Sequence, residues 1–380
     1  MWGNDTGASL PVALEVLRRG PISRADIGRR LGLSHASLSR LSAPLIERGV
    51  IVDVGEDNNG RVGRPSRLLD VDASSHYFLG VKIREREVIC AVTDLRGDVS
   101  DSIAVELSAQ DPDAVVEHIR RVHSMYSTNR IITGIGIALG GAVHERRVVT
   151  SADFLNWNNV PLADLIESAT HTPALIENDV VALCEYEDWF GLASHDARFA
   201  VITLGIGTGF GLVVNGQPVV NDDYGIGLVG HWPMDPTGPL CDQGHRGCAA
   251  ALLNSGAIAR YATEALGRET TFDETLLLAA DNHPAAERIV RDAAHGLGIL
   301  IAAICNLTLP ERIIIGGEGV RLAELGQEVM LESMQTMRDP RAHTPPIDFT
   351  TGDNIEWARG AAVLAIQAFA LGRLTPVLRA

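Results

Sequence analysis

Two cysteines and an upstream histidine give residues 230–248, GHWPMDPTGPLCDQGHRGC, most of the ligands of a zinc site. His231 stands ten residues before Cys241, and Cys248 follows seven residues later, with glycines between the cysteines that permit tight turns. Four thiolates or imidazoles hold zinc in a tetrahedral structural site. Here Gln243 lies between the two cysteines, and a carboxamide is a poor zinc ligand.

The sequence therefore does not decide whether this segment binds a metal ion. Three good ligands and a water molecule would form an open and weaker site. His245 or Asp242 could supply the fourth ligand only if the loop repacked. Without metal, the glycines can still fold the loop, and Cys241 and Cys248 would behave as small buried hydrophobes.

Length and composition favour a large globular protein of the cytoplasm. At 380 residues the chain exceeds the usual size of one domain, so two or three units are expected. Five cysteines, an odd number in mostly apolar contexts, fit reduced thiols. The longest apolar run, GLGILIAAICNLTL, is shorter than the roughly 20 residues of a membrane span. The first residues lack the basic-then-apolar order of a signal peptide, and no membrane partner is expected.

Charge is distributed unevenly along the chain. The net charge is −16, which by itself argues against a nucleic-acid binder. However, residues 1–70 contain ten Arg and eight Asp or Glu, whereas the rest contains 22 basic and 40 acidic side chains. This asymmetry is typical of a small neutral-to-basic module joined to a large acidic body.

The small module has the pattern of a helix-turn-helix. Ser23, followed three residues later by Asp26, predicts the start of a helix through Leu31, and Gly32 then supplies the turn. Ser34 can cap the next helix.

The second helix has an apolar face and a polar face. Leu38, Leu41 and Leu45 share the apolar face, while Pro44 should bend this helix or end it early. The N-terminal part of such a helix enters the major groove of DNA. The side chains predicted to meet DNA are Ser34, His35, Ser37 and Arg40.

A basic hairpin follows these helices. Two β-prone runs, GVIVDVG and LLDVD, flank a glycine-rich loop that carries Arg61, Arg64 and Arg67. This pattern is typical of a wing, whose arginines reach phosphates or the minor groove. The alternative is a three-helix protein-interaction module with a solvated loop. The agreement of helix spacing, turn and hairpin favours a winged helix-turn-helix over residues 1–72 that binds a double-stranded operator.

The acidic body is predicted to be an internally duplicated α/β domain. Strand-like runs YFLGVKI, EVICAVTDL and DVSDSIAVEL, then a helix and IITGIGIAL, are matched later by RFAVITLG, GFGLVVNG and QPVV, then helices and ERIIIGG. Two such halves favour two lobes with a cleft between them.

An ordered set of motifs gives the body a specific resemblance. LGIGTGFGLVVNG at 204–216, the GH pair, the two-cysteine block, END at 177–179 and IIIGGEGV at 313–320 together resemble the ROK family. That family groups sugar kinases of the actin-like, ribonuclease-H-like superfamily with transcriptional repressors that carry an N-terminal winged helix. The resemblance covers essentially the whole chain. It implies a ROK kinase-like body over 73–380, with lobe 1 at about 73–190 plus the C-terminal helix and lobe 2 at about 191–357.

The motif expected to bind the phosphates of ATP is altered. Kinases of the superfamily carry a DxGGT-like turn between their first two strands, where this chain reads GVKIREREVIC. Lys82 takes the place of the Asp, and Arg84, Glu85 and Arg86 replace small residues. Backbone amides could not approach phosphate there, so no ATP turnover and no enzymatic activity are expected.

A second glycine turn, at 205–211, is intact. It could bind nucleotide, or it could be a tight hairpin whose glycines need positive φ angles.

The resemblance also implies an effector site for a sugar. Asn178 and Asp179 match a sugar-contacting pair whose Asp is the general base of the kinases, so Asp179 would be a vestige of that base; it could also cap a helix. His231 matches a residue that both touches sugar and joins the zinc site. Two family carboxylates are replaced, by Leu228 and Ala250. Each hydrogen bond to a charged group is worth ~1.5–3 kcal/mol, so loss of two carboxylates should weaken sugar binding. Either the effector differs from a simple hexose, or the pocket is degenerate.

The sequence thus predicts a cytoplasmic transcriptional regulator, a repressor of carbohydrate-related genes that responds to a sugar or sugar-derived effector. Effector binding would shift a population of conformers and change the spacing of paired DNA-binding heads. The resemblance implies a homodimer or a dimer of dimers. The alternatives are an ATP-dependent sugar kinase with a fused DNA-binding module and a repressor without an effector.

Overall fold

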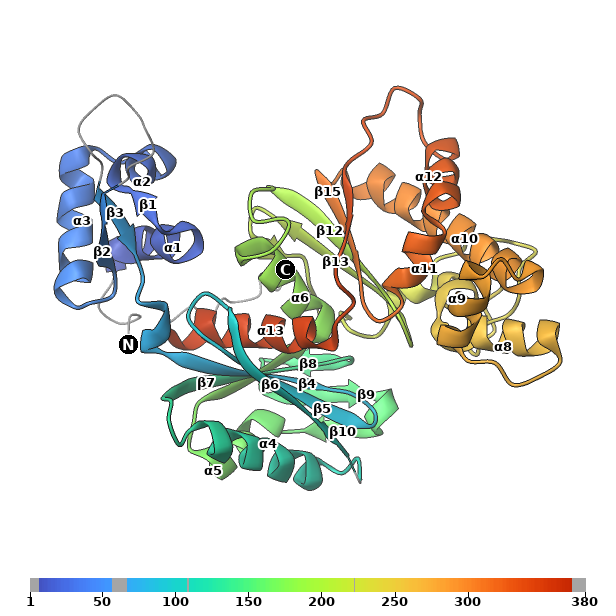
Figure 1. Cartoon of the computed structure of the whole chain (residues 1–380), viewed down its shortest axis with the longest axis horizontal. Coiled ribbons are helices and arrows are strands. Elements are labelled where there is room, and N and C mark those ends of the chain that lie inside the picture. The colour runs from blue at the N-terminus through green and yellow to red at the C-terminus, as the bar shows by residue number, and fades with distance from the viewer. Residues whose placement is uncertain (1–6, 57–66, 108, 222, 371–380) are drawn as a thin grey trace. The chain divides into compact units, whose positions relative to one another are not determined.

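The computed structural model describes residues 7–56, 67–107, 109–221 and 223–370 (Figure 1). The chain forms two compact units, Met1–Ala182 with Trp357–Pro376 and Leu183–Glu356 with Val377–Ala380. Within the described residues the chain passes between them at two points, inside helix α6 (Asp179–Trp189) and inside the first turn of helix α13 (Asn354–Ala365). Each crossing is thus a continuous helix.

Unit 1 begins with a small helical module, blue in Figure 1, which we call the head. Three helices pack around Val16, Ile27, Leu38 and Leu45, each at most 1% exposed. A three-stranded sheet in the order β1-β3-β2 completes the head, with both pairs antiparallel. Its elements are η1 (Gly7–Ser9), α1 (Leu10–Arg19), β1 (Ile22–Ser23), α2 (Arg24–Leu31), α3 (His35–Glu47), β2 (Val52–Glu56) and β3 (Arg67–Asp70).

The caps predicted for the helix-turn-helix are present. Ser23 Oγ accepts a hydrogen bond from the Asp26 amide at 3.1 Å, and Gly32 ends α2 in the left-handed region at φ 64°. Ser34 Oγ accepts from the Ser37 amide at 3.2 Å and starts α3. Local hydrogen bonding therefore fixes where both helices begin.

Of the two outcomes expected of Pro44, a bend in the second helix or an early end to it, the early end is wrong. Helix α3 continues past Pro44 to Glu47. Proline lacks an amide hydrogen, so the carbonyl four residues before it loses its partner in the helix. That carbonyl belongs to Arg40, an exposed residue, where water can take the place of the amide.

Lobe 1, the rest of unit 1, is built on a five-stranded sheet of order β11-β7-β4-β5-β6. Strands β4, β5 and β6 pair antiparallel, whereas β4, β7 and β11 pair parallel. Helices α4 and α5 contribute to the core on one face. The elements are η2 (Ala73–Ser75), β4 (Tyr77–Ile83), β5 (Glu87–Thr93), β6 (Val99–Glu106), α4 (Pro112–Tyr126), β7 (Ile132–Leu139), α5 (Leu162–Thr170) and β11 (Ala174–Asn178). A small sheet that the sequence did not predict is formed by β8 (Ala142–His144), β9 (Val148–Ala152) and β10 (Trp157–Val160), with η3 (Asp153–Leu155) between the last two strands.

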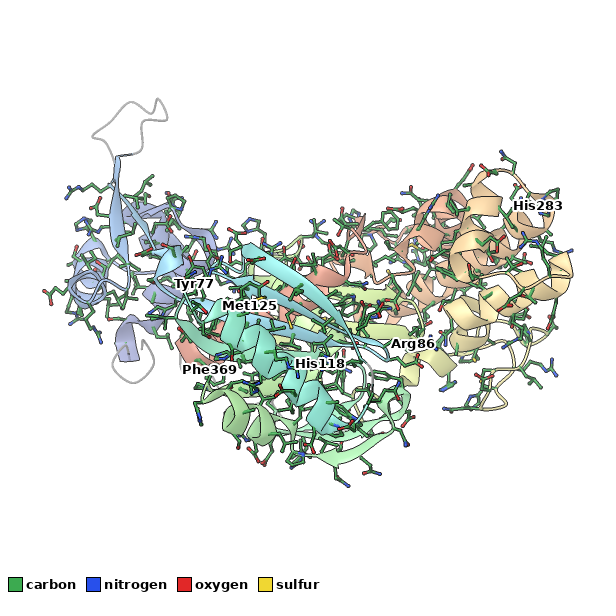
Figure 2. All side chains as sticks on the ribbon, turned by 60° about the horizontal axis from the view of Figure 1, so that its bottom comes forward. Tyr77, Arg86, His118, Met125, His283 and Phe369 are labelled. Carbon is green, nitrogen blue, oxygen red and sulfur yellow. The ribbon has the colours of Figure 1, made fainter. Side chains whose placement is uncertain are left out.

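Helix α13 lies directly on this five-stranded sheet because glycines leave room for its backbone. A Cβ atom at Gly80 of β4 would overlap the Ala358 carbonyl, and one at Gly136 of β7 would overlap that of Ala361. A π-helical turn (Ile366–Ala370) continues the helix, and its Phe369, labelled in Figure 2, lies over Gly134. The C-terminal helix thus belongs to the unit of lobe 1.

Unit 2, lobe 2, repeats the same sheet order. Its strands run β14-β13-β12-β15-β16, with the first three antiparallel and the last three parallel. The elements are β12 (Arg198–Leu204), β13 (Thr208–Val214), β14 (Gln217–Pro218), η4 (Leu228–His231), α7 (Ala249–Leu253), α8 (Ser255–Leu266), α9 (Phe272–Ala280), α10 (Pro284–Thr308), β15 (Arg312–Gly316), α11 (Val320–Leu325), α12 (Gln327–Thr336) and β16 (Ile347–Phe349). When the five strands of each sheet are numbered in chain order, both sheets have the spatial order 3-2-1-4-5, with the sheet of lobe 1 read from β6 to β11. The shared order confirms the duplication predicted from the sequence.

Helix α10 is long and apolar enough to cross a membrane, but 61% of its most apolar window is buried inside the protein. Leu297, Leu300 and Ile301 on this helix are at most 1% exposed and belong to the core of lobe 2. Its hydrophobicity is that of a core helix.

Candidate functional site

The exposed surface of α3 carries the side chains predicted to meet DNA. Ser34, His35 and Arg40 are exposed. Ser37 is half-buried, and its hydroxyl oxygen lies 3.0 Å from that of Ser34. All four lie in the N-terminal half of α3 or at its cap. An uncovered helix N-terminus with polar side chains and an arginine is suited to phosphates and base edges.

The wing is confirmed as an antiparallel pair, since β2 and β3 run side by side. Arg61 and Arg64 lie outside the described residues. Arg67, the first residue of β3, is exposed and forms an ion pair with Asp53 across the hairpin at 3.4 Å.

In lobe 1, Lys82 is paired with Asp179. Lys82 lies on β4, Asp179 is the first residue of α6, and their side chains are only 8% and 15% exposed. The Lys82 ammonium also lies 4.8 Å from the centre of the Trp357 ring, at the start of α13. A general base needs a free oxygen to take a proton, and here an ammonium occupies one oxygen of the carboxylate.

The neighbouring Asn178 holds the local backbone. Its amide nitrogen donates to the Gly141 carbonyl at 3.0 Å, and its oxygen accepts from the Val180 amide at 2.9 Å. Asn178 is therefore the capping residue of α6. Asn178 and Asp179 lie together in unit 1, while His231 belongs to unit 2.

The altered phosphate turn is short and closed. The Arg84 amide donates to the Glu87 carbonyl at 2.9 Å, and the two side chains form an ion pair at 2.8 Å. Arg86, labelled in Figure 2, projects into solvent with 88% of its side chain exposed. Arg84, Glu85 and Arg86 give this turn long charged side chains, and it has no glycine backbone that could receive phosphate.

The second glycine turn is a hairpin between β12 and β13, but its glycines do not have the positive φ angles expected of them. Gly205 instead lies close against another side chain. A Cβ atom there would lie within 2.9 Å of the Glu318 carboxylate. Sequence reasoning missed Glu318, although it stands in the quoted motif IIIGGEGV. Its carboxylate puts a negative charge beside Gly205, and such a charge repels phosphate.

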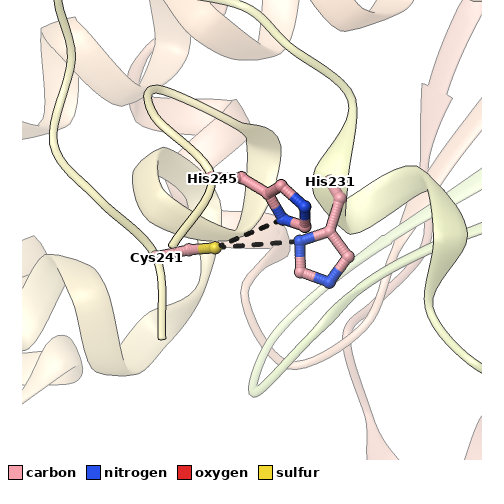
Figure 3. A group of neighbouring side chains, drawn as sticks. All are labelled: His231, Cys241 and His245. Atoms are coloured by element: carbon pink, nitrogen blue, oxygen red, sulfur yellow. Dashed lines mark hydrogen bonds between the residues drawn. The ribbon is translucent and has the colours of Figure 1, made fainter. Parts of the chain in front are cut away.

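The metal-ligand residues converge in lobe 2 (Figure 3). The Cys241 Sγ atom is 3.8 Å from His231 Nδ1 and 3.7 Å from His245 Nδ1. The Cys248 Sγ atom is 4.0 Å from His231 Nδ1. Bond lengths of about 2.0–2.3 Å around tetrahedral zinc place donor atoms roughly 3.4–3.8 Å apart. Ligand atoms of His231, Cys241 and His245 all lie within 4.8 Å of one another, so these three residues could hold a metal ion, while the Cys248 sulfur lies slightly outside the ideal spacing.

His245 reaches this cluster through a turn. The Gly244 amide donates to the Cys241 carbonyl, and the Cys241 amide to the His245 carbonyl, both at 2.9 Å. Gly244 has φ 83°, which favours glycine. The turn returns the chain on itself, so that the rings of His231 and His245 are 4.6 Å apart. The sequence allowed His245 as a fourth ligand only if the loop repacked, and this turn is what brings His245 to Cys241.

Electrostatics in the cluster favour metal-binding forms at two positions. Burial, and then the neighbouring His245, lower the pKa of His231, which keeps its imidazole neutral. Burial by itself would raise the pKa of Cys241, but hydrogen bonds from the amides of Gln243 and His245 bring it below its ordinary value. Burial raises the pKa of Cys248. Cys90, Cys184 and Cys305 are free and buried, as predicted.

The two positions that lost carboxylates lie near His231. Leu228 begins η4 and is 64% exposed, and His231 ends the same short 3₁₀ helix. Residues three apart in such a helix share a face. A Cβ atom at Gly230 would be 3.8 Å from the Ala250 Cβ. This surface therefore has a leucine and an alanine beside His231.

Comparison with known proteins identifies the family of this chain. A sequence profile of the ROK family matches residues 78–368. The DNA-binding transcriptional repressor Mlc of Escherichia coli (strain K12) is 25% identical over 338 residues, which are 84% of this chain and 83% of that protein. The crystal structure of a ROK family transcriptional regulator, described as a homologue of that repressor, is 25% identical with a TM-score of 0.81 and 96% coverage of both chains.

A kinase of the same fold matches a smaller share of the chain. The ROK hexokinase of Thermus thermophilus is 26% identical with a TM-score of 0.65, and the match covers 76% of this chain and 97% of that one. The similarity to the regulator thus spans nearly the whole chain, whereas the similarity to the hexokinase spans about three quarters of it. The two-lobed body of actin-like type and the head architecture, with the matching profile, show that this chain belongs to the ROK family.

Proposed function

We propose that this protein is a DNA-binding transcriptional repressor of carbohydrate-related genes. The observation that carries this function is the helix-turn-helix of α2 and α3, whose second helix leaves Ser34, His35 and Arg40 exposed. The similarity to a transcriptional regulator over 96% of both chains supports it. Its partner is a double-stranded operator, which α3 reads in the major groove while the wing contacts the backbone or minor groove.

The DNA-binding test begins with duplexes selected by the purified protein from fragments of its own genome. In gel shift, Arg40→Ala is expected to weaken binding at least about ten-fold, because an arginine contact to a base is worth about 1–3 kcal/mol. Arg288→Ala is the matched control, since Arg288 is an exposed arginine of lobe 2. Equal affinities of wild type and Arg40→Ala would refute the assignment of α3.

A sugar-derived effector is the second part of the proposal, with Asn178, Asp179 and His231 as its contacts. Leu228 and Ala250 beside His231 offer apolar surface where carboxylates would hold hydroxyl groups. An effector of altered polarity, such as an N-acylated or deoxygenated sugar, suits this surface better than a plain hexose.

Thermal-shift screening with pentoses, hexoses, N-acetylated aminosugars and their phosphates tests the effector. A specific ligand at 100 times its Kd stabilises the folded protein by ~2.7 kcal/mol and raises the Tm. The Leu228→Glu/Ala250→Glu variant restores both carboxylates and is expected to bind a plain hexose more tightly than wild type does. A protein that gains no stability from any of these ligands would be a repressor without an effector of this class.

The rival function is an ATP-dependent sugar kinase. Against it stand the Lys82 ammonium on Asp179, the closed turn at Arg84–Arg86 and the Glu318 carboxylate beside Gly205. A coupled assay for ADP with the same sugars is expected to give no turnover above the Asp179→Asn background. Turnover that Asp179→Asn abolishes would establish the kinase instead.

We also propose that one structural zinc ion is held by His231, Cys241, His245 and Cys248. The ion would supply no chemistry and would fix the loop. Metal analysis is expected to find one zinc per chain in wild type and a clear loss in His245→Ala. His343→Ala, at an exposed histidine elsewhere in lobe 2, is the control. Wild-type protein without zinc after purification in zinc-supplemented buffer would overturn this assignment.

The remaining parts of the proposal concern assembly and location. A homodimer, or a dimer of dimers, in the cytoplasm would place two heads on a two-fold operator. Light scattering at micromolar protein concentration gives the mass directly. A monomer that binds its operator with one head would contradict this assembly.

A further inference from the structure

The tight turn between β5 and β6, residues 94–98, is closed by hydrogen bonds of its own residues. The Asp94 carboxylate accepts hydrogen bonds from the amides of Arg96 at 2.8 Å and Asp98 at 3.0 Å. The Asp94 carbonyl accepts from the Gly97 amide at 3.1 Å, and Gly97 has φ 71°. A turn held by its own side chain presents Arg96 in a fixed direction.

Arg96 contacts the head at two places. Its guanidinium donates to the carbonyls of Leu17 at 3.0 Å and Val16 at 3.3 Å, in the last turn of α1, and also pairs with Asp70 at the end of β3. Both charged side chains are less than a fifth exposed. The carbonyl end of a helix attracts a cation, and a planar guanidinium can serve several acceptors at once.

The head is shaped to receive this guanidinium. Gly20 follows α1, and a Cβ atom there would lie 2.6 Å from both the Arg96 guanidinium and the Asp70 carboxylate. Any side chain at position 20 would thus displace the contact. Gly20 and Asp70 in the head are matched to Arg96 in lobe 1.

The same turn is tied to α13 from its other side. Arg359 Nε donates to the Gly97 carbonyl at 2.5 Å, and its guanidinium donates to the Asp98 carboxylate at 3.0 Å. Arg359 lies two residues after Trp357, where the chain enters unit 1 and where the Trp357 ring faces the Lys82 ammonium held by Asp179. Contacts therefore run without a break from Asp179, through α13 and the turn, to the head.

From this chain of contacts we propose that residues 94–98 form a coupling turn. Arg96 is a positioning residue that orients the head on lobe 1, and Arg359 transmits changes around Asp179 to it. The coupling goes beyond the proposed function, and it would give an effector at Asp179 a physical route to α1. Its measurement needs neither DNA nor effector, so its failure and that of the proposed function are distinguishable.

The first measurement is ¹⁵N relaxation of the full chain. In wild type, the amides of α1 and α2 are expected to share the rotational correlation time of lobe 1. In Arg96→Gln their correlation time should fall by about two-fold or more, since a released head reorients faster than the body. Asp70→Asn removes the same contact from the head side and should act likewise. Arg120→Gln, which removes an exposed ion pair within α4, should change nothing.

The second measurement follows the relay. Asp179→Asn is expected to shift the amide resonances of Leu17–Gly20, and the shift should vanish in Asp179→Asn/Arg359→Gln. A wild-type head that already reorients independently, or one that stays fixed in both Arg96→Gln and Asp70→Asn, would overturn the coupling turn. Persistence of the shift in the double variant would overturn the role of Arg359.

Discussion

Replacing Lys82 by methionine removes the cation that neutralises Asp179, and we expect this change to destabilise lobe 1 by about 3 kcal/mol. The two side chains are 8% and 15% exposed, so the pair counts as nearly buried. Removing one partner of a buried pair costs about 3–5 kcal/mol, because a charge is left without compensation. Loss of the cation–π contact with Trp357 adds about 0.5–2 kcal/mol.

Two features reduce this cost. The Asp179 carboxylate still accepts a hydrogen bond from the Val180 amide at 2.9 Å, and it lies at the N-terminus of α6, where the helix dipole favours a negative charge. Methionine also covers the Trp357 ring with apolar atoms. The low end of the range is therefore the expected value.

Urea unfolding of Lys82→Met, Asp179→Asn and the double variant forms the assay, with hydrogen exchange in β4 and α6 identifying the transition of lobe 1. The decrease in unfolding free energy of the double variant should be smaller than the sum of the two single decreases by at least about 1.5 kcal/mol, because neither charge is left without its partner. Arg120→Met, in an exposed pair, should lose less than about 0.5 kcal/mol. If Lys82→Met also lost less than about 0.5 kcal/mol of unfolding free energy and showed no coupling with Asp179→Asn, the ion pair would not stabilise lobe 1 and Asp179 would not depend on Lys82.

Three further predictions concern single positions. His123 is buried beside Thr172, and burial lowers its pKa below the 6.5 of a free imidazole. The unfolded chain therefore binds a proton more readily, so stability should fall as the pH drops below about 6.5, and His123→Gln should flatten this dependence in urea titrations at pH 5–7. Gly80→Ala should destabilise lobe 1 by about 1–3 kcal/mol or prevent its folding, because the added methyl group overlaps the α13 backbone; an unchanged Tm would contradict the packing. Ser34→Ala should cost about 0.5–2 kcal/mol of head stability through loss of the cap, measured by urea unfolding, and a neutral result would mean that water replaces the hydroxyl.

The elements of the fold were largely readable in the sequence where local chemistry decides them. The capping serines at 23 and 34, the glycine at 32 and the alternating β-prone runs of both lobes gave helices and strands that the structure contains. Pro44 shows the limit of local reasoning. Its cost inside a helix is real, but packing of Leu38 and Leu45 in the head core stabilises α3 on both sides of it.

The sequence identified most residues of the candidate sites, but it did not show which of them come into contact. His231, Cys241 and Cys248 were recognised from spacing, whereas His245 joined them only through the turn at Gly244. The sequence left the glycines of the second turn to nucleotide binding or to a tight hairpin, whereas in the structure Gly205 lies against the side chain of Glu318, more than a hundred residues away in the chain. Separations of that size cannot be derived from local spacing.

By itself, the sequence determined the class of protein, since the helix-turn-helix, the basic hairpin and the ordered motifs of the body are local patterns with local causes. Only the tertiary structure decided what the charged residues do. Lys82 and Asp179 are 97 positions apart and meet because β4 and the start of α6 lie beside one another in lobe 1. Arg96 meets the head because a turn at the edge of the sheet reaches the end of α1. Folding sets such distances, and the strength of a charge pair depends on its distance and burial.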